Sequence, residues 1–137
     1  MKLKIHTDGG SLQNPGQAAS AYLIYDKDTN ELVYSHGVAI GIASNNVAEY
    51  TALINALEHV LEMQKTQSVE SVQIVADSEL MIRQVNGIYK VKNIDMKPLF
   101  NKVKMLELSL GIPISYTHVL REHNAEADAL VKKALGR

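Results

Sequence analysis

The sequence contains no cysteine and no long apolar run, and these absences exclude several classes of protein. Without cysteine there are no disulfides, no thiolate zinc sites and no cysteine nucleophile, which is consistent with a reducing compartment. No segment approaches the ~20 consecutive apolar residues of a membrane span. The N-terminus reaches an acid and two glycines before any apolar stretch long enough for a signal peptide. We therefore expect a cytoplasmic protein with no membrane partner.

The sequence also has no large excess of positive or negative charge. Lysine and arginine total 14 against 15 aspartate and glutamate residues, so the net charge is -1. Proteins that bind nucleic acids by non-specific attraction usually carry a global basic excess, so any nucleic-acid contact of this chain is expected to be local. A length of 137 residues with 46% hydrophobic content is typical of one globular domain, which we expect to span residues 1–137.

The spacing of apolar residues predicts alternating strands and helices. Period-2 alternation and short apolar runs predict strands over residues 3–8, 18–25, 32–42, 72–76 and 114–119. Helical spacing predicts helices over residues 46–64, 78–85, 98–110 and 124–135. We expect Gly9-Gly10 to turn the chain after the first strand, and Asn45 or Asn46 and then Asn124 to cap the first and last helices. This order predicts an α/β (mixed α+β) fold with a five-stranded mixed sheet, three antiparallel strands first, flanked by helices.

Two acids lie where these patterns require apolar residues. Glu49 precedes Leu53 by four residues and Val60 by eleven, so it points along the core-facing stripe of the first helix. Asp128 lies three residues before Val131, close to the inward face of the last helix. A buried carboxylate costs several kcal/mol unless it is paired or bound to a metal.

Two further acids, Asp8 and Asp77, follow predicted strands, at the edge where an open sheet borders a crevice. Each acid by itself is consistent with a cap, a turn or a solvated charge, because acids are mostly exposed. Together, four converging carboxylates would repel one another, and a hard divalent cation such as Mg²⁺ relieves that repulsion. A pair of such ions about 3.5 to 4 Å apart can activate a water and stabilise the leaving oxygen of a phosphodiester.

Four segments resemble the motifs of type 1 ribonucleases H. The segment Thr7–Gly16, read TDGGSLQNPG, is similar to the family's TDG(G/S)-x-x-x-NPG opening, and Ser44–Tyr50 is similar to its T-N-N-x-x-E-(L/Y) element. Val75–Ser78 follows a strand as the family's third motif does, and Arg121–Leu130 contains the N-x-x-A-D-x-L pattern. The four motifs occur in the family's order and span nearly the whole chain, so a chance match is negligible.

The resemblance implies a metal-dependent endoribonuclease that cuts the RNA strand of RNA/DNA hybrids with two Mg²⁺ ions, for which Mn²⁺ can substitute. It implies that Asp8, Glu49 and Asp77 hold metal, with Asp8 bridging both ions and Asp128 completing the second site. It also implies contacts to the 2′-hydroxyls of the RNA strand, which distinguish RNA from DNA. The residues implied in these contacts are Gly9, Gly10, Asn14, Asn45, Asn46 and Glu79.

The chain departs from the family pattern in two places. Neither a basic protrusion nor a separate hybrid-binding domain fits into it, and residues 87–98 supply only a few lysines. We therefore expect weaker and more salt-sensitive hybrid binding than in relatives with either appendage. The loop before the last helix is short, so no histidine matches the family's product-release histidine. His123 is a candidate for proton transfer or product release, with Arg121 and Glu122 as rivals.

Three other interpretations remain open at this stage. A non-catalytic nucleic-acid or protein interaction module would share the fold, but the presence of all four acids favours an enzyme. A phosphoryl-accepting signalling domain would alternate strand and helix from its first strand, whereas this chain opens with three strands. A ribonuclease H-fold protein with weak or no hybrid cleavage, acting on another nucleic acid, is the main alternative, because metal chemistry is indifferent to substrate. Protein partners are not predicted.

Overall fold

The first three strands form an antiparallel meander in the computed structural model, which describes residues 1–137. They are β1 (Lys2–Ser11), β2 (Gly16–Asp26) and β3 (Leu32–Ala43). Along β1 the apolar Leu3 and Ile5 are buried on one face while Lys4 and His6 lie on the other, as the period of two requires. The meander therefore offers one face to a large core.

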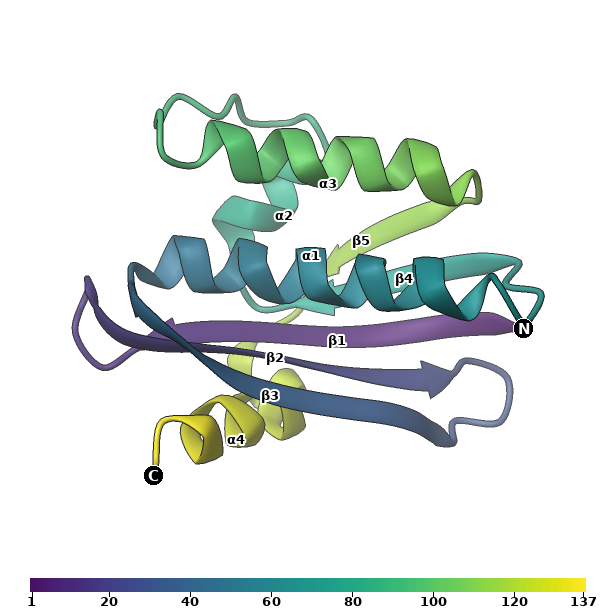
Figure 1. The fold of residues 1–137 in the computed structure, drawn as a ribbon, viewed down its shortest axis with the longest axis horizontal. Helices are drawn as coiled ribbons and strands as arrows, with labels where there is room; N and C mark the ends of the chain where they lie inside the picture. Colours follow the sequence, from purple (N-terminus) through teal and green to yellow (C-terminus); the bar gives the residue numbers. More distant parts are fainter.

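Two parallel strands complete the sheet beside β1. These are β4 (Ser71–Ala76) and β5 (Ile114–His118), and the strand order is β3-β2-β1-β4-β5. The sheet is therefore mixed, antiparallel on one side of β1 and parallel on the other, with helices on both faces (Figure 1). The predicted fold class is confirmed, including the position of the three antiparallel strands at the start of the chain.

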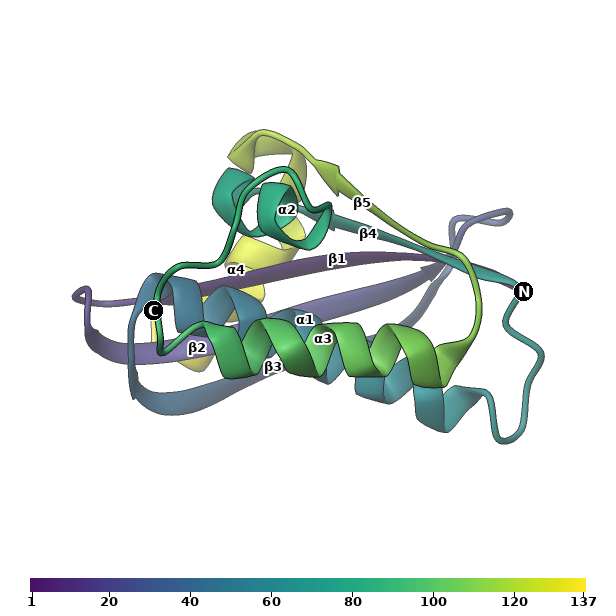
Figure 2. The same cartoon turned by 90° about the horizontal axis from the view of Figure 1, so that it is seen from above.

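The helices divide between the two faces of the sheet. Helix α1 (Asn45–Met63) packs against β1 and β2, and α3 (Lys97–Leu110) packs on α1 (Figures 1 and 2). The short α2 (Glu79–Val85) follows β4, near β5. A 3₁₀ turn, η1 (Arg121–Asn124), leads into α4 (Ala125–Ala134), which covers the opposite face of β1, β2 and β3. No helix combines the length and apolar character that crossing a membrane requires.

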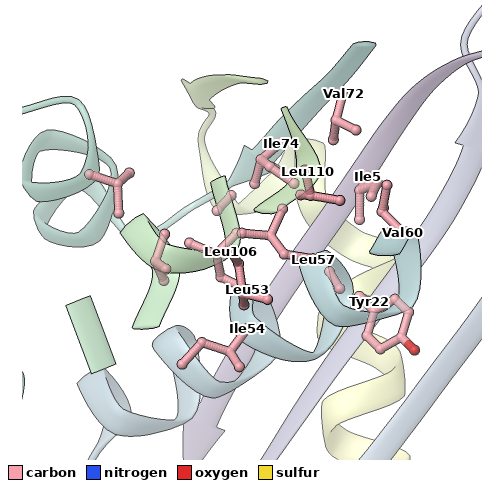
Figure 3. Close-up of a cluster of buried hydrophobic side chains, with 14 of the residues drawn as sticks. Ile5, Tyr22, Leu53, Ile54, Leu57, Val60, Val72, Ile74, Leu106 and Leu110 are labelled. Carbon is pink, nitrogen blue, oxygen red and sulfur yellow. The ribbon is translucent and has the colours of Figure 1, made fainter. Parts of the chain in front are cut away.

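Each face of the sheet has its own core. The larger core has 22 buried residues, most of them from β1, β2, β4 and the helices α1, α2 and α3, and Ile5, Leu57 and Ile74 are among them (Figure 3). The smaller core, under α4, has three buried residues, Ala19, Ala21 and Val131. Because burial of apolar surface is the dominant stabilising term, α4 is held by far less of it than α1.

Two local predictions are wrong, and a third is confirmed in position only. Gly9 and Gly10 do not turn the chain, because they pair with Ser20 and Ala19 of β2 and extend β1 to Ser11. Ser44, not Asn45 or Asn46, caps α1, since its side-chain oxygen accepts the N–H of Val47. The predicted N-cap position of Asn124 is confirmed, but its side chain makes no capping hydrogen bond to α4.

Candidate active site

Asp8, Glu49 and Asp77 meet at one point in the structure. One carboxylate oxygen from each lies within 4.8 Å of the other two, although the residues belong to β1, α1 and the end of β4. The pairing of β1 with β4 explains part of this proximity, because His6 is opposite Val75 and both acids lie two residues further along. Residues two apart in a strand point to the same face, so Asp8 and Asp77 become neighbours.

Glu49 reaches this point because α1 approaches β1 very closely. The Gly9 N–H donates to Glu49 Oε1 at 3.2 Å, and Ser20 Oγ donates to the Ala48 carbonyl at 2.7 Å. A Cβ placed on Gly9 would lie 2.2 Å from the carbonyl carbon of Ala48, a distance that no side chain tolerates. Glycine at position 9 is therefore required for the helix and strand to bring the two acids together.

Burial and mutual repulsion favour the protonated form of two of these acids. The pKa of Asp8 is raised to about 7, first by burial and then by the negative charges of Asp77 and Asp128. The pKa of Glu49 is raised well above its ordinary value by burial, by the charge of Asp8 and by hydrogen bonding with it. Ionised together, these groups are uncompensated buried charges, because no cationic side chain pairs with Asp8, Glu49 or Asp77.

The three acids fit a hard divalent cation. Every available ligand atom is a carboxylate oxygen, the donor type that Mg²⁺, Ca²⁺ and Mn²⁺ prefer. Glu49 Oε2 is buried, and no group donates a hydrogen bond to it when the carboxylate is ionised. A bound cation would compensate both this unpartnered oxygen and the repulsion among the three charges.

Asp128 lies apart from the three-acid cluster. It approaches from α4 on the other face of the sheet, where its side chain is 17% exposed and lies 3.0 Å from Lys132 Nζ. Asp8 and Asp128 line the same cavity of about 150 Å³, together with Gly9, Gly10 and Arg121. The structure thus gathers three of the four predicted ligands and leaves the fourth across a small cavity.

Some of the residues predicted to contact the substrate lie beside this region. Gly9 and Gly10 line the cavity of Asp8. Asn14 Oδ1 accepts the backbone N–H of Asn45 at 3.0 Å, and Asn45 Oδ1 accepts the N–H of Ser11 at 2.9 Å. These bonds tie the loop after β1 to the start of α1. Asn46 is exposed at the start of α1.

Glu79 lies two residues after Asp77, at the start of α2. It is exposed, and its Oε1 accepts from Arg83 Nε at 2.9 Å.

The three candidates for proton transfer or product release point in different directions. Arg121 lines the cavity of Asp8 and Asp128, with its guanidinium 4.0 Å from Asp128. Glu122 and His123 instead line a separate cavity of about 310 Å³ beside Lys4, which contains none of the four acids. The geometry favours Arg121 as the residue of this turn nearest the acids.

The sequence did not indicate the contacts of Asn124. The residue is 1% exposed. Its Nδ2 donates to the carbonyl of Thr7 at 2.9 Å, and Oδ1 lies 2.9 Å from Nδ1 of His6. In the sequence, the preference of asparagine for the N-cap explains its presence at this position. No local pattern indicates hydrogen-bond partners more than 110 residues away in the chain.

Comparison with known proteins gives consistent matches. The reverse transcriptase-like family model matches residues 6–134. Ribonuclease HI of Halobacterium salinarum is 35% identical over 135 residues, which are 98% of this chain and 64% of that protein. A bifunctional protein of Mycobacterium tuberculosis is 34% identical over 135 residues, 98% of this chain and 36% of that protein. This chain therefore spans 36% of the length of the first curated relatives it matches.

Solved structures superpose over nearly the whole chain. LC11-RNase H1 in complex with RNA/DNA hybrid has a TM-score of 0.91 at 37% identity, covering 98% of this chain and 96% of that chain. RNase H1 from Halobacterium salinarum has a TM-score of 0.91 at 32% identity, covering 99% of this chain and 98% of that chain.

Proposed function

The chain belongs to the reverse transcriptase-like, ribonuclease H family, and from this premise we propose that it is an endoribonuclease that hydrolyses the RNA strand of RNA/DNA hybrids. The observation that carries the proposal is the meeting of three carboxylates without a cationic partner, the buried Asp8 and Glu49 and the partly exposed Asp77. The family is metal-dependent, and this cluster supplies the ligands that metal dependence needs.

We propose Mg²⁺ as the physiological ion, with Mn²⁺ able to replace it. Asp8, Glu49 and Asp77 would hold metal, and Asp128 would complete a second site across the cavity. Bound ions of this kind polarise the scissile phosphate and activate the attacking water. The protein orients the ligands: the Gly9 N–H holds Glu49 through Oε1, and the parallel pairing of β1 with β4 places Asp8 beside Asp77.

Recognition of the RNA strand is assigned to the loop after β1 and the start of α1. Gly9, Gly10, Asn14, Asn45 and Asn46 would contact 2′-hydroxyls, with Glu79 as a further candidate. The hydrogen bonds from Asn45 to Asn14 and from Ser11 to Asn45 support this assignment, because they hold that surface in one arrangement beside the acids. A cytoplasmic location stays a prediction, which cell fractionation tests.

One experiment tests the proposed function. Purified protein is incubated with end-labelled RNA/DNA hybrid, duplex DNA or duplex RNA, each with Mg²⁺, Mn²⁺ or chelator, and the products are resolved by length. We expect internal cleavage of the RNA strand of the hybrid alone, and only when metal is present. Asp77→Asn is the matched inactive control, because it removes a ligand charge without changing side-chain volume.

Two results would overturn the proposal. Cleavage that continues in chelator would remove the metal-dependent mechanism. Hybrid binding without cleavage in either metal would favour the alternative of a ribonuclease H-fold protein that acts on another nucleic acid or serves as a binding module.

A further inference from the structure

Asn124 is a buried polar residue whose contacts differ from those of a helix cap. It occupies the N-cap position of α4, yet its side chain accepts no N–H from that helix. The whole residue is 1% exposed, and both ends of its amide are hydrogen-bonded to β1. A buried amide with both ends paired is costly to disturb, because removing it leaves its partners unsatisfied.

The partners of Asn124 determine the orientation of its amide. A carbonyl oxygen only accepts, so the group at 2.9 Å from the Thr7 carbonyl is the donor Nδ2. Oδ1 therefore faces His6, and the His6 ring donates to it through Nδ1 at 2.9 Å. Both partners lie immediately before Asp8 in β1.

The other contacts that hold α4 on the sheet are a small apolar core and an exposed hydrogen bond. The helix has ten residues, too few to be stable on its own, and none of them belongs to the larger core. Its apolar support is the small core of Ala19, Ala21 and Val131, against which the partly buried Leu130, Ala134 and Leu135 pack, together with the buried Ala127. The hydrogen bond from Tyr25 to Glu126 is exposed. The amide of Asn124 is thus the buried polar link between the start of α4 and β1.

Asp128 follows Asn124 by four residues, about one turn of α4. A movement of the start of the helix therefore carries the Asp128 carboxylate with it. Asp8, Glu49 and Asp77 have their own links through the Gly9 N–H and the pairing of β1 with β4. Loss of the Asn124 link would leave the three-acid cluster in place and change only its distance to Asp128.

We propose that Asn124 is a positioning residue that sets the place of Asp128 opposite Asp8, an inference that rests on the proposed function. Its loss weakens the half of the metal centre that includes Asp128. Residues that orient metal ligands from outside typically change metal affinity or activity by about 10–100-fold when replaced. A purely structural asparagine would change stability and leave metal dependence untouched.

The test compares the Mg²⁺ dependence of cleavage in four single variants. Asn124→Ala removes both hydrogen bonds, and Asn124→Asp keeps the acceptor for His6 but loses the donor to Thr7. The aspartate variant keeps the side-chain volume and lies at a helix N-terminus, where a negative charge is favourable. Gln64→Ala is the matched control, since Gln64 Nε2 also donates to a backbone carbonyl, that of Leu110, at 3.0 Å. Asp128→Asn defines the loss of the ligand itself.

We expect both Asn124 variants to need at least about tenfold more Mg²⁺ for half-maximal cleavage, while KM for the hybrid and the Gln64→Ala profile stay at wild-type values. In the double variant Asn124→Ala/Asp128→Asn, cleavage should fall no further than in Asp128→Asn alone, because Asn124 acts through Asp128. Wild-type Mg²⁺ dependence in both Asn124 variants, or additive losses in the double variant, would overturn the inference.

A second readout separates this inference from the proposed function. Titration calorimetry with Mn²⁺ alone measures metal binding without nucleic acid, and we expect weaker binding in Asn124→Ala and Asn124→Asp but not in Gln64→Ala. If the wild-type protein binds Mn²⁺ in this pattern yet cuts no hybrid, the proposed activity fails and the positioning role stands. If it cuts hybrid and the Asn124 variants bind Mn²⁺ as the wild type does, the positioning role fails alone.

Discussion

Replacing Asp8 by Asn should abolish hybrid cleavage and stabilise the metal-free protein. The pKa of Asp8 is raised to about 7 from a reference of 3.8, because the carboxyl is buried and faces Asp77 and Asp128. Each pH unit of difference corresponds to about 1.4 kcal/mol, so full ionisation of Asp8 costs the native state about 4 kcal/mol. Glu49 shares part of this repulsion, so we expect a gain of about 2–4 kcal/mol for Asp8→Asn above pH 7.

The sign of the pH dependence follows from the direction of the shift. Below about pH 4, Asp8 is protonated in the native and unfolded states alike, and it contributes no difference. Between pH 4 and 7 the native state binds more protons, so wild-type stability falls as the pH rises. Asparagine does not titrate, so the advantage of Asp8→Asn should be small at pH 4.5 and complete at pH 8.

Urea denaturation in chelator, followed by circular dichroism at pH 4.5 and pH 8, measures this difference. For a domain of this size, 2–4 kcal/mol corresponds to roughly 6–15 °C in melting temperature. Asp28→Asn, at an exposed position in the turn between β2 and β3, is the control for loss of one negative charge. Added Mg²⁺ should stabilise the wild type by mass action and Asp8→Asn much less. An Asp8→Asn protein less stable than the wild type at pH 8 would refute the electrostatic reasoning.

Three further predictions concern packing, the turn before α4 and the substrate. Gly9→Ala should lower the melting temperature by roughly 10 °C, because its Cβ would lie 2.2 Å from Ala48 and overpacking of this kind costs about 3 kcal/mol. Gly10→Ala is the control and should melt close to the wild type, because the atom nearest to its Cβ would lie 3.8 Å away. Arg121→Ala should reduce turnover, whereas His123→Ala should leave steady-state kinetics unchanged, since only Arg121 lines the cavity of the acids. Hybrid affinity should fall steeply with salt in a binding titration, and tight binding that is indifferent to ionic strength would contradict this expectation.

The meeting of Asp8, Glu49 and Asp77 could be predicted in part from the sequence. Glu49 occupies a core-facing position of an otherwise apolar stripe, which marks it as unusual, whereas Asp77 was singled out because it directly follows a strand. The order of strands and helices in the fold then determines which strand ends and helix ends lie next to one another. Asp128 was expected on the inward face of α4 and is partly exposed, because the cavity keeps that face open.

The local errors have a common cause, which is that contacts with other parts of the chain outweigh the preference of a residue for a local role. Ser44, Asn45 and Asn46 all favour the N-cap, and contacts with the loop after β1 decide that Ser44 takes it while Asn45 bonds to Ser11. Gly9 was predicted to turn the chain, but pairing with β2 and the approach of α1 give it a place inside a strand. Asn124 forms hydrogen bonds with residues of β1 that lie more than 110 positions earlier in the chain, and local propensity does not predict contacts at such a sequence separation.

The separate, smaller core beneath α4 predicts how the proposed activity would be lost. Local opening requires less free energy where few apolar contacts must be broken, so this helix can detach while the sheet and its principal helices persist. Such a partially open form would keep most of its circular dichroism signal, but Asp128 would no longer lie opposite Asp8. The time for which the protein stays active under heat or denaturant would then depend on how firmly α4 is packed on the sheet. Substitutions that stabilise only the larger core would not lengthen that time.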